Sequence, residues 1–248
     1  MYERVNKKMK ILIIRHGEPD YSIDSLTEKG WREAELLSRR LEKLNIDAIY
    51  CSPLGRARDT AKPTLEKLGM KAEVLPWLEE FRGQMPPRGK FGKTHPWDIH
   101  PSRWENDETV FDRNRWTDAK FLNPGSVAQI YDETKRGFDE LMLHHGYRRE
   151  GLMFRCDENT DKTIALFCHF GLGTAIVAYM AGVSPFIMWH SFFMPTSSVT
   201  TMISSEVRRG EVFFKCMQMG DTSHLYAAGE PVSRSGLMPE MFDPDYEE

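Results

Sequence analysis

In the stretch Ile11-Leu12-Ile13-Ile14-Arg15-His16-Gly17, four consecutive apolar residues are followed directly by an arginine and a histidine. Three of the four apolar residues are β-branched, which is typical of a parallel strand that is covered on both faces. Open α/β sheets bind ligands beyond the carboxyl ends of such strands. The sequence therefore predicts a buried strand that places Arg15 and His16 in a ligand crevice, with His16 as the candidate nucleophile.

A second apolar run ends in the same way, because Ile164-Ala165-Leu166-Phe167-Cys168 leads directly into His169. If the two strands are neighbours in one sheet, both imidazoles converge on one crevice. A lone His169 is more often an interior imidazole with a satisfied hydrogen bond, so its match with His16 favours a functional role. Neither histidine has other potential ligands at a recognised spacing, and no metal site is predicted.

Helix and strand signals alternate along the chain. Apolar spacing predicts a helix over residues 27–44 that Thr27 caps, and a second helix that Ser52 caps and Pro53 begins. A third helix follows Pro124-Gly125-Ser126. Further strands are predicted at residues 47–51, 73–77, 198–204 and 212–217, the last two as a hairpin at a sheet edge. This alternation predicts an α/β fold with a mostly parallel central sheet.

Between residues 81 and 123 the periodicity is lost, and prolines, glycines and three tryptophans (Trp97, Trp104 and Trp116) replace it. A structureless loop of that length is uncommon in a compact domain and is usually functional. We expect a single domain over residues 1–248 with a lid inserted at about 81–123. A small helical subdomain that only packs against the domain is an equally good interpretation of this segment.

Composition narrows the classes of partner. The net charge of −4 comes from mixed charges with no basic patch, which argues against a nucleic-acid partner. The four cysteines lack any paired-ligand spacing and fit free thiols in a reducing compartment. The apolar run at 11–14 is too short for a secretory signal, and His169 and two glycines interrupt residues 164–183, the longest apolar stretch. We therefore expect a cytoplasmic protein with no membrane partner.

Two further elements carry charge suited to phosphate chemistry. Arg56 falls in the opening turn of the second predicted helix, where free backbone N–H groups and the helix dipole already attract anions. An ordinary surface arginine is the alternative. Glu79 and Glu80 follow the strand predicted at 73–77, and two adjacent carboxylates are usually just solvated.

Taken together, these elements resemble a known family. The motifs Arg15-His16-Gly17, Leu26-Thr27-Glu28-Lys29-Gly30, the run at 52–61, Leu78-Glu79-Glu80 and the late His169 have the order and spacing of the histidine phosphatase superfamily, phosphoglycerate mutase-like branch. The resemblance implies a three-layer α/β/α fold. It also implies that His16 is phosphorylated, that Arg15, Arg56 and His169 hold the phosphoryl group, and that Glu80, from the pattern Leu-x-Glu, serves as proton donor.

The chemistry of a phosphomonoester fits these roles. Its negative charge repels a nucleophile, and two guanidinium groups with a second imidazole neutralise that charge without a metal or other cofactor. His16 must attack as neutral imidazole, which an unperturbed pKa of about 6.5 allows. A backbone carbonyl near Gly17 is expected to fix its tautomer. The predicted function is hydrolysis of a small phosphorylated metabolite through a phosphohistidine on His16, with His16, Glu80 and His169 as catalytic residues.

Three other functions remain as alternatives. A phosphoglycerate-type mutase is disfavoured because Pro19, Asp20 and Tyr21 replace the residues that usually follow the first motif, and the extended substrate-binding pattern of mutases is missing. A module that only binds a phosphorylated ligand need not keep a nucleophile and an acid together. A phosphoprotein phosphatase would need an open entrance in place of an aromatic lid. The oligomeric state cannot be predicted.

Overall fold

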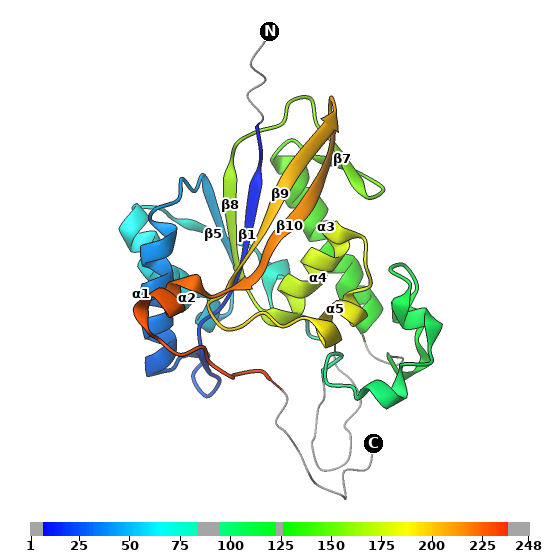
Figure 1. The fold of residues 1–248 in the computed structure, drawn as a ribbon, viewed down its shortest axis with the longest axis horizontal. Coiled ribbons are helices and arrows are strands. Elements are labelled where there is room, and N and C mark those ends of the chain that lie inside the picture. Colours follow the sequence, from blue (N-terminus) through cyan, green and yellow to red (C-terminus); the bar gives the residue numbers. More distant parts are fainter. Residues whose placement is uncertain (1–6, 84–94, 123–125, 238–248) are drawn as a thin grey trace, which may run out of the picture.

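The computed structural model describes residues 7–83, 95–122 and 126–237, and its centre is one eight-stranded sheet (Figure 1). The strand order is β5-β4-β8-β1-β9-β10-β7-β6, and β2 and β3 form a separate pair. The strands are β1 (Lys10–Arg15), β2 (Pro19–Asp20), β3 (Ser25–Leu26), β4 (Ala48–Cys51), β5 (Ala72–Val74), β6 (Arg148–Glu150), β7 (Met153–Arg155), β8 (Thr163–Cys168), β9 (Val199–Arg208) and β10 (Glu211–Asp221).

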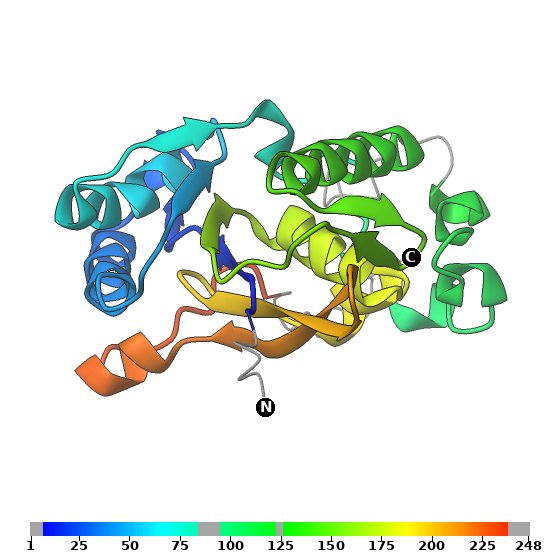
Figure 2. The same ribbon diagram turned by 90° about the horizontal axis from the view of Figure 1, so that it is seen from above.

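Helices cover both faces of this sheet, and Figure 2 shows the three layers. The α-helices are α1 (Glu28–Leu41), α2 (Gly55–Leu68), α3 (Val127–His144), α4 (Phe170–Ala181), α5 (Pro185–Ser191) and α6 (Ser223–Ala228). Ile11 and Ile13 of β1 pack into the core on the side of α3 and α4, whereas Leu12 and Ile14 pack on the side of α1 and α2. Successive side chains of a strand alternate between faces, so four apolar residues in a row are what a doubly covered strand needs. The predicted three-layer α/β/α fold is confirmed.

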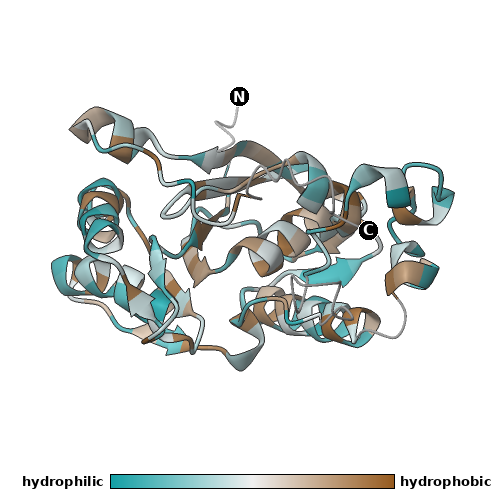
Figure 3. Ribbon diagram, turned by 90° about the horizontal axis from the view of Figure 1, so that it is seen from below, coloured by the Kyte–Doolittle hydropathy of each residue, from teal (hydrophilic) through white to brown (hydrophobic). Residues whose placement is uncertain are grey.

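Apolar residues gather on the central strands and on α4, while α1, α2 and α3 carry polar residues on their outer sides (Figure 3). Helix α4 is buried along most of its length, because it lies between the sheet, α3 and α5. In the part of the chain that the structure describes, no helix is long and apolar enough to cross a membrane. Residues 164–183 form most of β8 and all of α4, as the strand–turn–helix interpretation predicts.

The sheet departs from the prediction in two respects. Strands β5, β4, β8 and β1 are parallel, but β9, β10, β7 and β6 join by antiparallel pairing, so the sheet is mixed and not mostly parallel. The hairpin of β9 and β10 exists, but it lies inside the sheet. The edge is formed by β6 and β7, two three-residue strands that were too short and too polar to predict.

Two of the predicted helix starts can be compared with the structure. The hydroxyl of Thr27 accepts a hydrogen bond from the backbone N–H of Gly30 at 3.0 Å and caps α1, as predicted, and α1 ends at Leu41. Helix α2 begins at Gly55, later than expected, and Ser52 is not its cap. Instead the carboxylate of Asp24 accepts from the N–H of Gly55 at 2.7 Å. The strand expected at 73–77 is shorter, because a 3₁₀ turn begins at Pro76.

The expected insertion is described only at residues 81–83 and 95–122, and residues 84–94 and 123 lie outside the described ranges. Residues 95–122 form short 3₁₀ turns beside α3 and α5 (Figure 1). Trp116 is completely buried and packs edge-on against Tyr131 and Trp189, so this tryptophan belongs to the core. Trp97 lies elsewhere, near the site described next.

Candidate active site

The two histidines predicted to converge lie side by side. Strands β1 and β8 are parallel neighbours, and their register pairs Arg15 with Cys168, so both chains leave the sheet at the same level. The imidazole rings of His16 and His169 are 5.2 Å apart between centroids. Both side chains are buried, at 2% and 0% exposure.

The orientation of His16 is set by the backbone around Gly17. Nδ1 of His16 lies 2.7 Å from the carbonyl oxygen of Gly17, the acceptor expected from the sequence. A carbonyl can only accept, so Nδ1 carries the proton and Nε2 keeps its lone pair. The N–H of Gly17 donates to the hydroxyl of Thr60 at 2.8 Å, and that hydroxyl donates to the carbonyl of Arg56 at 2.7 Å. The nucleophile loop is thereby fixed to the first turn of α2.

Three buried nitrogen atoms near this imidazole have no hydrogen-bond partner among the described residues: Nε of Arg15, Nε of Arg56 and Nδ1 of His169. Buried polar groups are almost always hydrogen-bonded, so three unpaired nitrogens in one site indicate that a ligand binds there. Guanidinium nitrogens only donate, and the missing partner must therefore accept. His169 also hydrogen-bonds through Nε2 to the hydroxyl of Ser52 at 2.7 Å, which holds its ring.

The two arginines are held by protein acceptors at their other nitrogens. Arg15 donates to the carbonyls of Met194 at 2.8 Å and Ser235 at 3.2 Å, and its guanidinium lies near the rings of Phe170 and Phe193. It is only 3% exposed. Phe170 thus forms an apolar wall beside this guanidinium.

Arg56 is held from another side. Its Nη1 pairs with Asp24 at 2.6 Å, and the exposed ring of Tyr21 lies 5.4 Å from its guanidinium carbon. Asp24 has a φ of 48°, a left-handed conformation that is uncommon outside glycine. One carboxylate therefore both holds Arg56 and accepts from the first N–H of α2.

Of the two adjacent glutamates, Glu80 contacts the start of α4. Its carboxylate accepts hydrogen bonds from the backbone N–H groups of Leu172 at 3.0 Å and Gly171 at 3.3 Å, in the first turn of α4 directly after His169. Glu79 instead pairs with the exposed Arg82. Glu80, and not Glu79, therefore lies beside the turn that carries His169.

Within residues 7–83, 95–122 and 126–237, no group of three or more His, Cys, Asp or Glu side chains is placed to hold a metal ion. The arrangement is that of a cationic crevice around an imidazole lone pair. Such a crevice can bind an oxyanion and attack it.

A match to a family model supports this interpretation: the model of the histidine phosphatase superfamily (branch 1) matches residues 11–214. The chain belongs to this superfamily.

Curated relatives of this histidine phosphatase superfamily member carry the names of phosphatases and of phosphoglycerate mutases. A Schizosaccharomyces pombe protein named "Probable phosphatase" is 43% identical over 75 residues, which is 27% of this chain and 34% of that protein. The adenosylcobalamin/alpha-ribazole phosphatase of Escherichia coli is 24% identical over 73% of this chain and 84% of its own length. The first of these alignments thus spans about a third of the relative.

Solved structures share the fold. The phosphoserine phosphatase of Entamoeba histolytica, solved in complex with 3-phosphoglyceric acid, superposes with a TM-score of 0.57. The superposition covers 88% of this chain and 99% of that chain at 20% identity. At this identity the likeness shows the fold alone. Family membership confirms the resemblance found in the sequence, and with it an enzyme of the phosphoryl-transfer class.

Sequence reasoning missed several residues of this site. Ser52 was interpreted as a helix cap, yet its hydroxyl holds His169. Asp24 gave no signal, because its partner Arg56 lies 32 positions away in the sequence. The carbonyls that hold Arg15 come from Met194 and Ser235, and backbone atoms leave no trace in a sequence pattern. Thr60 lies inside the quoted motif at 52–61 and could have been singled out there.

Burial decides the charge of both imidazoles in this superfamily member. It lowers the pKa of His16 well below the usual 6.5, and the charge of Arg15 lowers the pKa further. For His169 the pKa is likewise lowered by burial first, and then by His16 and Arg56. Both rings are therefore neutral at pH 7, which is the state that a nucleophilic imidazole requires.

The depressed histidine pKa values predict a loss of stability in acid. Burial also lowers the pKa of His145 and of His224 to about 4. A depressed pKa means that the unfolded chain binds protons first, so the stabilisation is complete above pH 6.5 and is lost as the pH falls from 6.5 toward 4. Each such histidine contributes up to about 1.4 kcal/mol per pH unit. We expect the free energy of unfolding, measured with urea, to fall by several kcal/mol between pH 7 and pH 5. A His224→Asn variant should show a shallower slope, and an unchanged slope would contradict the assignment.

Gly171 is the position where Glu80 and the insertion meet. A β-carbon at Gly171 would lie 2.3 Å from the ring of Trp97 and 2.9 Å from Oε1 of Glu80. We expect Gly171→Ala to displace both side chains, with a loss of about 1–3 kcal/mol of stability from overpacking and an activity loss of roughly tenfold or more. Turnover and thermal unfolding measure these effects. In the control Gly173→Ala, the nearest atom is a methyl of Ile13 at 3.0 Å, and activity should be retained.

Proposed function

We propose that this protein hydrolyses phosphomonoesters through a phosphohistidine at Nε2 of His16. The observation that supports it most directly is the set of three buried nitrogens without partners among the described residues, on Arg15, Arg56 and His169, next to an imidazole whose tautomer leaves Nε2 free. A phosphoryl group supplies acceptor oxygens for each of them. The site then holds the phosphorus beside the lone pair that attacks it.

The first step forms the phosphoenzyme. Nε2 of His16 bonds to phosphorus while the bond from phosphorus to the ester oxygen breaks, and the leaving oxygen takes a proton from Glu80. The positive charge that develops on the His16 ring is stabilised by the Gly17 carbonyl, which accepts from Nδ1. Arg15, Arg56 and His169 hold the nonbridging oxygens throughout.

The second step returns the enzyme to its starting state. A water molecule attacks phosphorus from the side that the alcohol has left, Glu80 takes a proton from that water, and the bond between phosphorus and Nε2 breaks. Inorganic phosphate leaves, and His16 is again neutral. The hydrogen bonds that Glu80 accepts in the first turn of α4, directly after His169, support its role in both proton transfers.

The enclosure of the site supports a small substrate. His16 and Arg15 are almost fully buried, and the segment around Ser235 and Gly236 lies directly against the Arg15 guanidinium. A phosphorylated side chain on a folded protein surface could not reach so deep a nucleophile. The names of the relatives, which include an alpha-ribazole phosphatase and phosphoserine phosphatases, support a phosphorylated metabolite as substrate. A lid role for residues 81–123 belongs to this proposal, with Trp97 as its contact to the site.

A panel of phosphomonoesters tests the proposal. We expect phosphate release from one or more of alpha-ribazole 5′-phosphate, phosphoserine, 3-phosphoglycerate and p-nitrophenyl phosphate, with the same rate in the presence of a chelator. Released phosphate and isomerised product are measured in the same samples. Isomerised 3-phosphoglycerate without phosphate release would replace the hydrolase proposal with a mutase, and inactivation by the chelator would contradict the metal-independent mechanism.

A further inference from the structure

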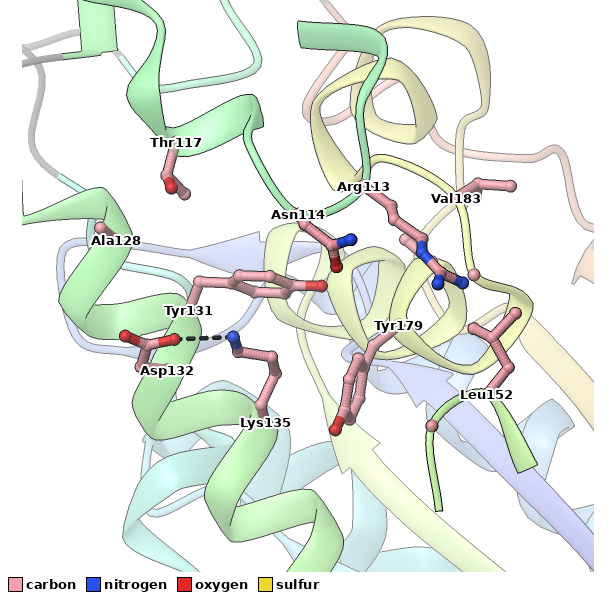
Figure 4. A pocket seen from close by; sticks show the side chains of 13 residues that line it. Arg113, Asn114, Thr117, Ala128, Tyr131, Asp132, Lys135, Leu152, Tyr179 and Val183 are labelled. Carbon is pink, nitrogen blue, oxygen red and sulfur yellow. Dashed lines mark ion pairs between the residues drawn. The ribbon is translucent and has the colours of Figure 1, made fainter. Parts of the chain in front are cut away.

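A second cavity lies at the opposite end of α4 from the histidines (Figure 4). It has a volume of about 450 Å³, opens to solvent beside the exposed Arg113 and Asn114, and is bounded by residues 113–117, α3, the turn between β6 and β7, and the end of α4 at Gly182. Helix α4 has 12 residues, so this end is about 18 Å from the end that follows His169. None of the candidate catalytic residues lines the cavity. Its volume is within the range of small-molecule sites.

Polar groups of three residues meet in this cavity. Figure 4 shows the guanidinium of Arg113, the side-chain amide of Asn114 and the hydroxyl of Tyr131 directed into the same space. Within the described ranges these three groups make no hydrogen bond or ion pair with the rest of the chain. Burial raises the pKa of Tyr131, so its hydroxyl keeps its proton and can donate. All three groups can therefore donate to one bound acceptor.

The charges around the cavity favour an anion. Arg149 lies next to the cavity, with its guanidinium carbon 4.1 Å from the ring centre of Tyr179, and its Nη1 and Nη2 are buried without hydrogen-bond partners among the described residues. Its Nε pairs with Asp139 at 3.1 Å. Lys135 pairs with Asp132 at 2.7 Å and lies over the ring of Tyr131. Among the described residues at the cavity, the three cations are Arg113, Lys135 and Arg149. Lys135 and Arg149 each pair with one aspartate, so Arg113 is the cation without an ion-pair partner there.

The remaining wall is apolar. Leu152, Val183 and the ring of Tyr179 line the side of the cavity next to the end of α4. Leu152 and Val183 are both substantially exposed. A ligand that covers them gains burial of apolar surface in addition to its polar contacts. The cavity therefore suits a molecule with one charged end and a compact apolar body.

We propose that this cavity is a second ligand site, separate from the catalytic one, that binds a small organic anion. Its carboxylate or phosphate group accepts from Arg113, Asn114 and Tyr131, and its apolar body lies against Leu152 and Val183. Bound there, the ligand contacts residues 113–117 together with α3 and α4. It fastens the segment that also carries Trp97 to the two helices.

Calorimetric titration of the full chain with phenylphosphonate, benzoate and neutral benzamide tests this proposal. The carbon–phosphorus bond of phenylphosphonate has no ester oxygen to leave, so the probe is not turned over. We expect saturable binding of at least one anion, no binding of benzamide, and roughly tenfold or greater weakening in Arg113→Gln, because a charge-assisted hydrogen bond is lost. Tyr131→Phe, which removes only the hydroxyl, should weaken binding as well. Hydrogen exchange at residues 151–153 and 178–183 should slow on binding.

Two matched variants locate the binding event. Arg115→Gln removes the same charge from an exposed residue that does not line the cavity, and it should bind like the wild type. Arg56→Gln disables the catalytic site and should keep binding at the second cavity. The binding result therefore tests this proposal separately from the proposed phosphatase function. The proposal is overturned if Arg113→Gln binds like the wild type, if Arg115→Gln loses as much affinity, if Arg56→Gln removes all binding, or if no anion saturates the protein.

Discussion

Replacement of His16 by alanine is expected to lower turnover of every phosphomonoester by on the order of 10⁴-fold or more, because the atom that bonds to phosphorus is lost. The crevice of Arg15, Arg56 and His169 remains in this variant. Substrate binding should therefore persist while chemistry stops, and KM should change far less than kcat. Steady-state kinetics on one aryl and one alkyl phosphate measure both quantities.

The control for this variant is His144→Ala, which removes an exposed imidazole of α3 and should leave kinetics unchanged. Rapid acid-free quenching during turnover should trap a phosphoryl label on wild-type protein that resists alkali and is lost in acid, as a phosphorus–nitrogen bond is. Peptide mapping should place it on His16. A label on another side chain, or full activity in His16→Ala, would end the case for a phosphohistidine mechanism.

Replacement of Glu80 by glutamine is expected to slow hydrolysis of alkyl phosphates by about 10²- to 10³-fold, since general acid catalysis has that size. Aryl phosphates should lose much less, because an aryl oxide leaves without a proton. Glutamine keeps one oxygen, which can accept from the N–H of Leu172, while its NH₂ replaces the oxygen that accepts from Gly171 at 3.3 Å, so the start of α4 keeps the shorter of the two hydrogen bonds. The ratio of kcat/KM for the two ester classes is the measured quantity.

Glu79→Gln is the matched control, because Glu79 has the same carboxylate one position earlier but pairs with Arg82. It should retain activity on both ester classes. Equal losses on aryl and alkyl phosphates in Glu80→Gln would indicate a structural role only. A selective loss in Glu79→Gln would transfer the acid role to that residue.

The part of the site that could be predicted rests on strands. Ile11 to Ile14 indicate a doubly covered strand, and residues placed directly after such strands can be assigned to one edge of the sheet from the sequence alone. His16, Arg15 and His169 were found in this way. The Gly17 carbonyl followed from the need of a neutral imidazole for an acceptor.

What could not be predicted depends on contacts between distant residues. Asp24 holds Arg56 only because two loops meet, and Ser52 reaches His169 only because β4 and β8 are neighbours. The antiparallel half of the sheet was underestimated because β6 and β7 are three residues long and expose most of their side chains. Such strands carry no apolar alternation, which is the signal that predicts a strand.

The position of β1 has a consequence for synthesis on the ribosome. Its two neighbours, β8 and β9, span residues 163–168 and 199–208, and Arg15 receives one of its acceptors from residue 235. A nascent chain therefore carries one of its most apolar segments without a strand to pair with until residue 163 has been made, and pairing across such long separations is slow. This exposure favours binding by chaperones that shield apolar segments, and the contacts of Arg15 are completed only after residue 235 has been added.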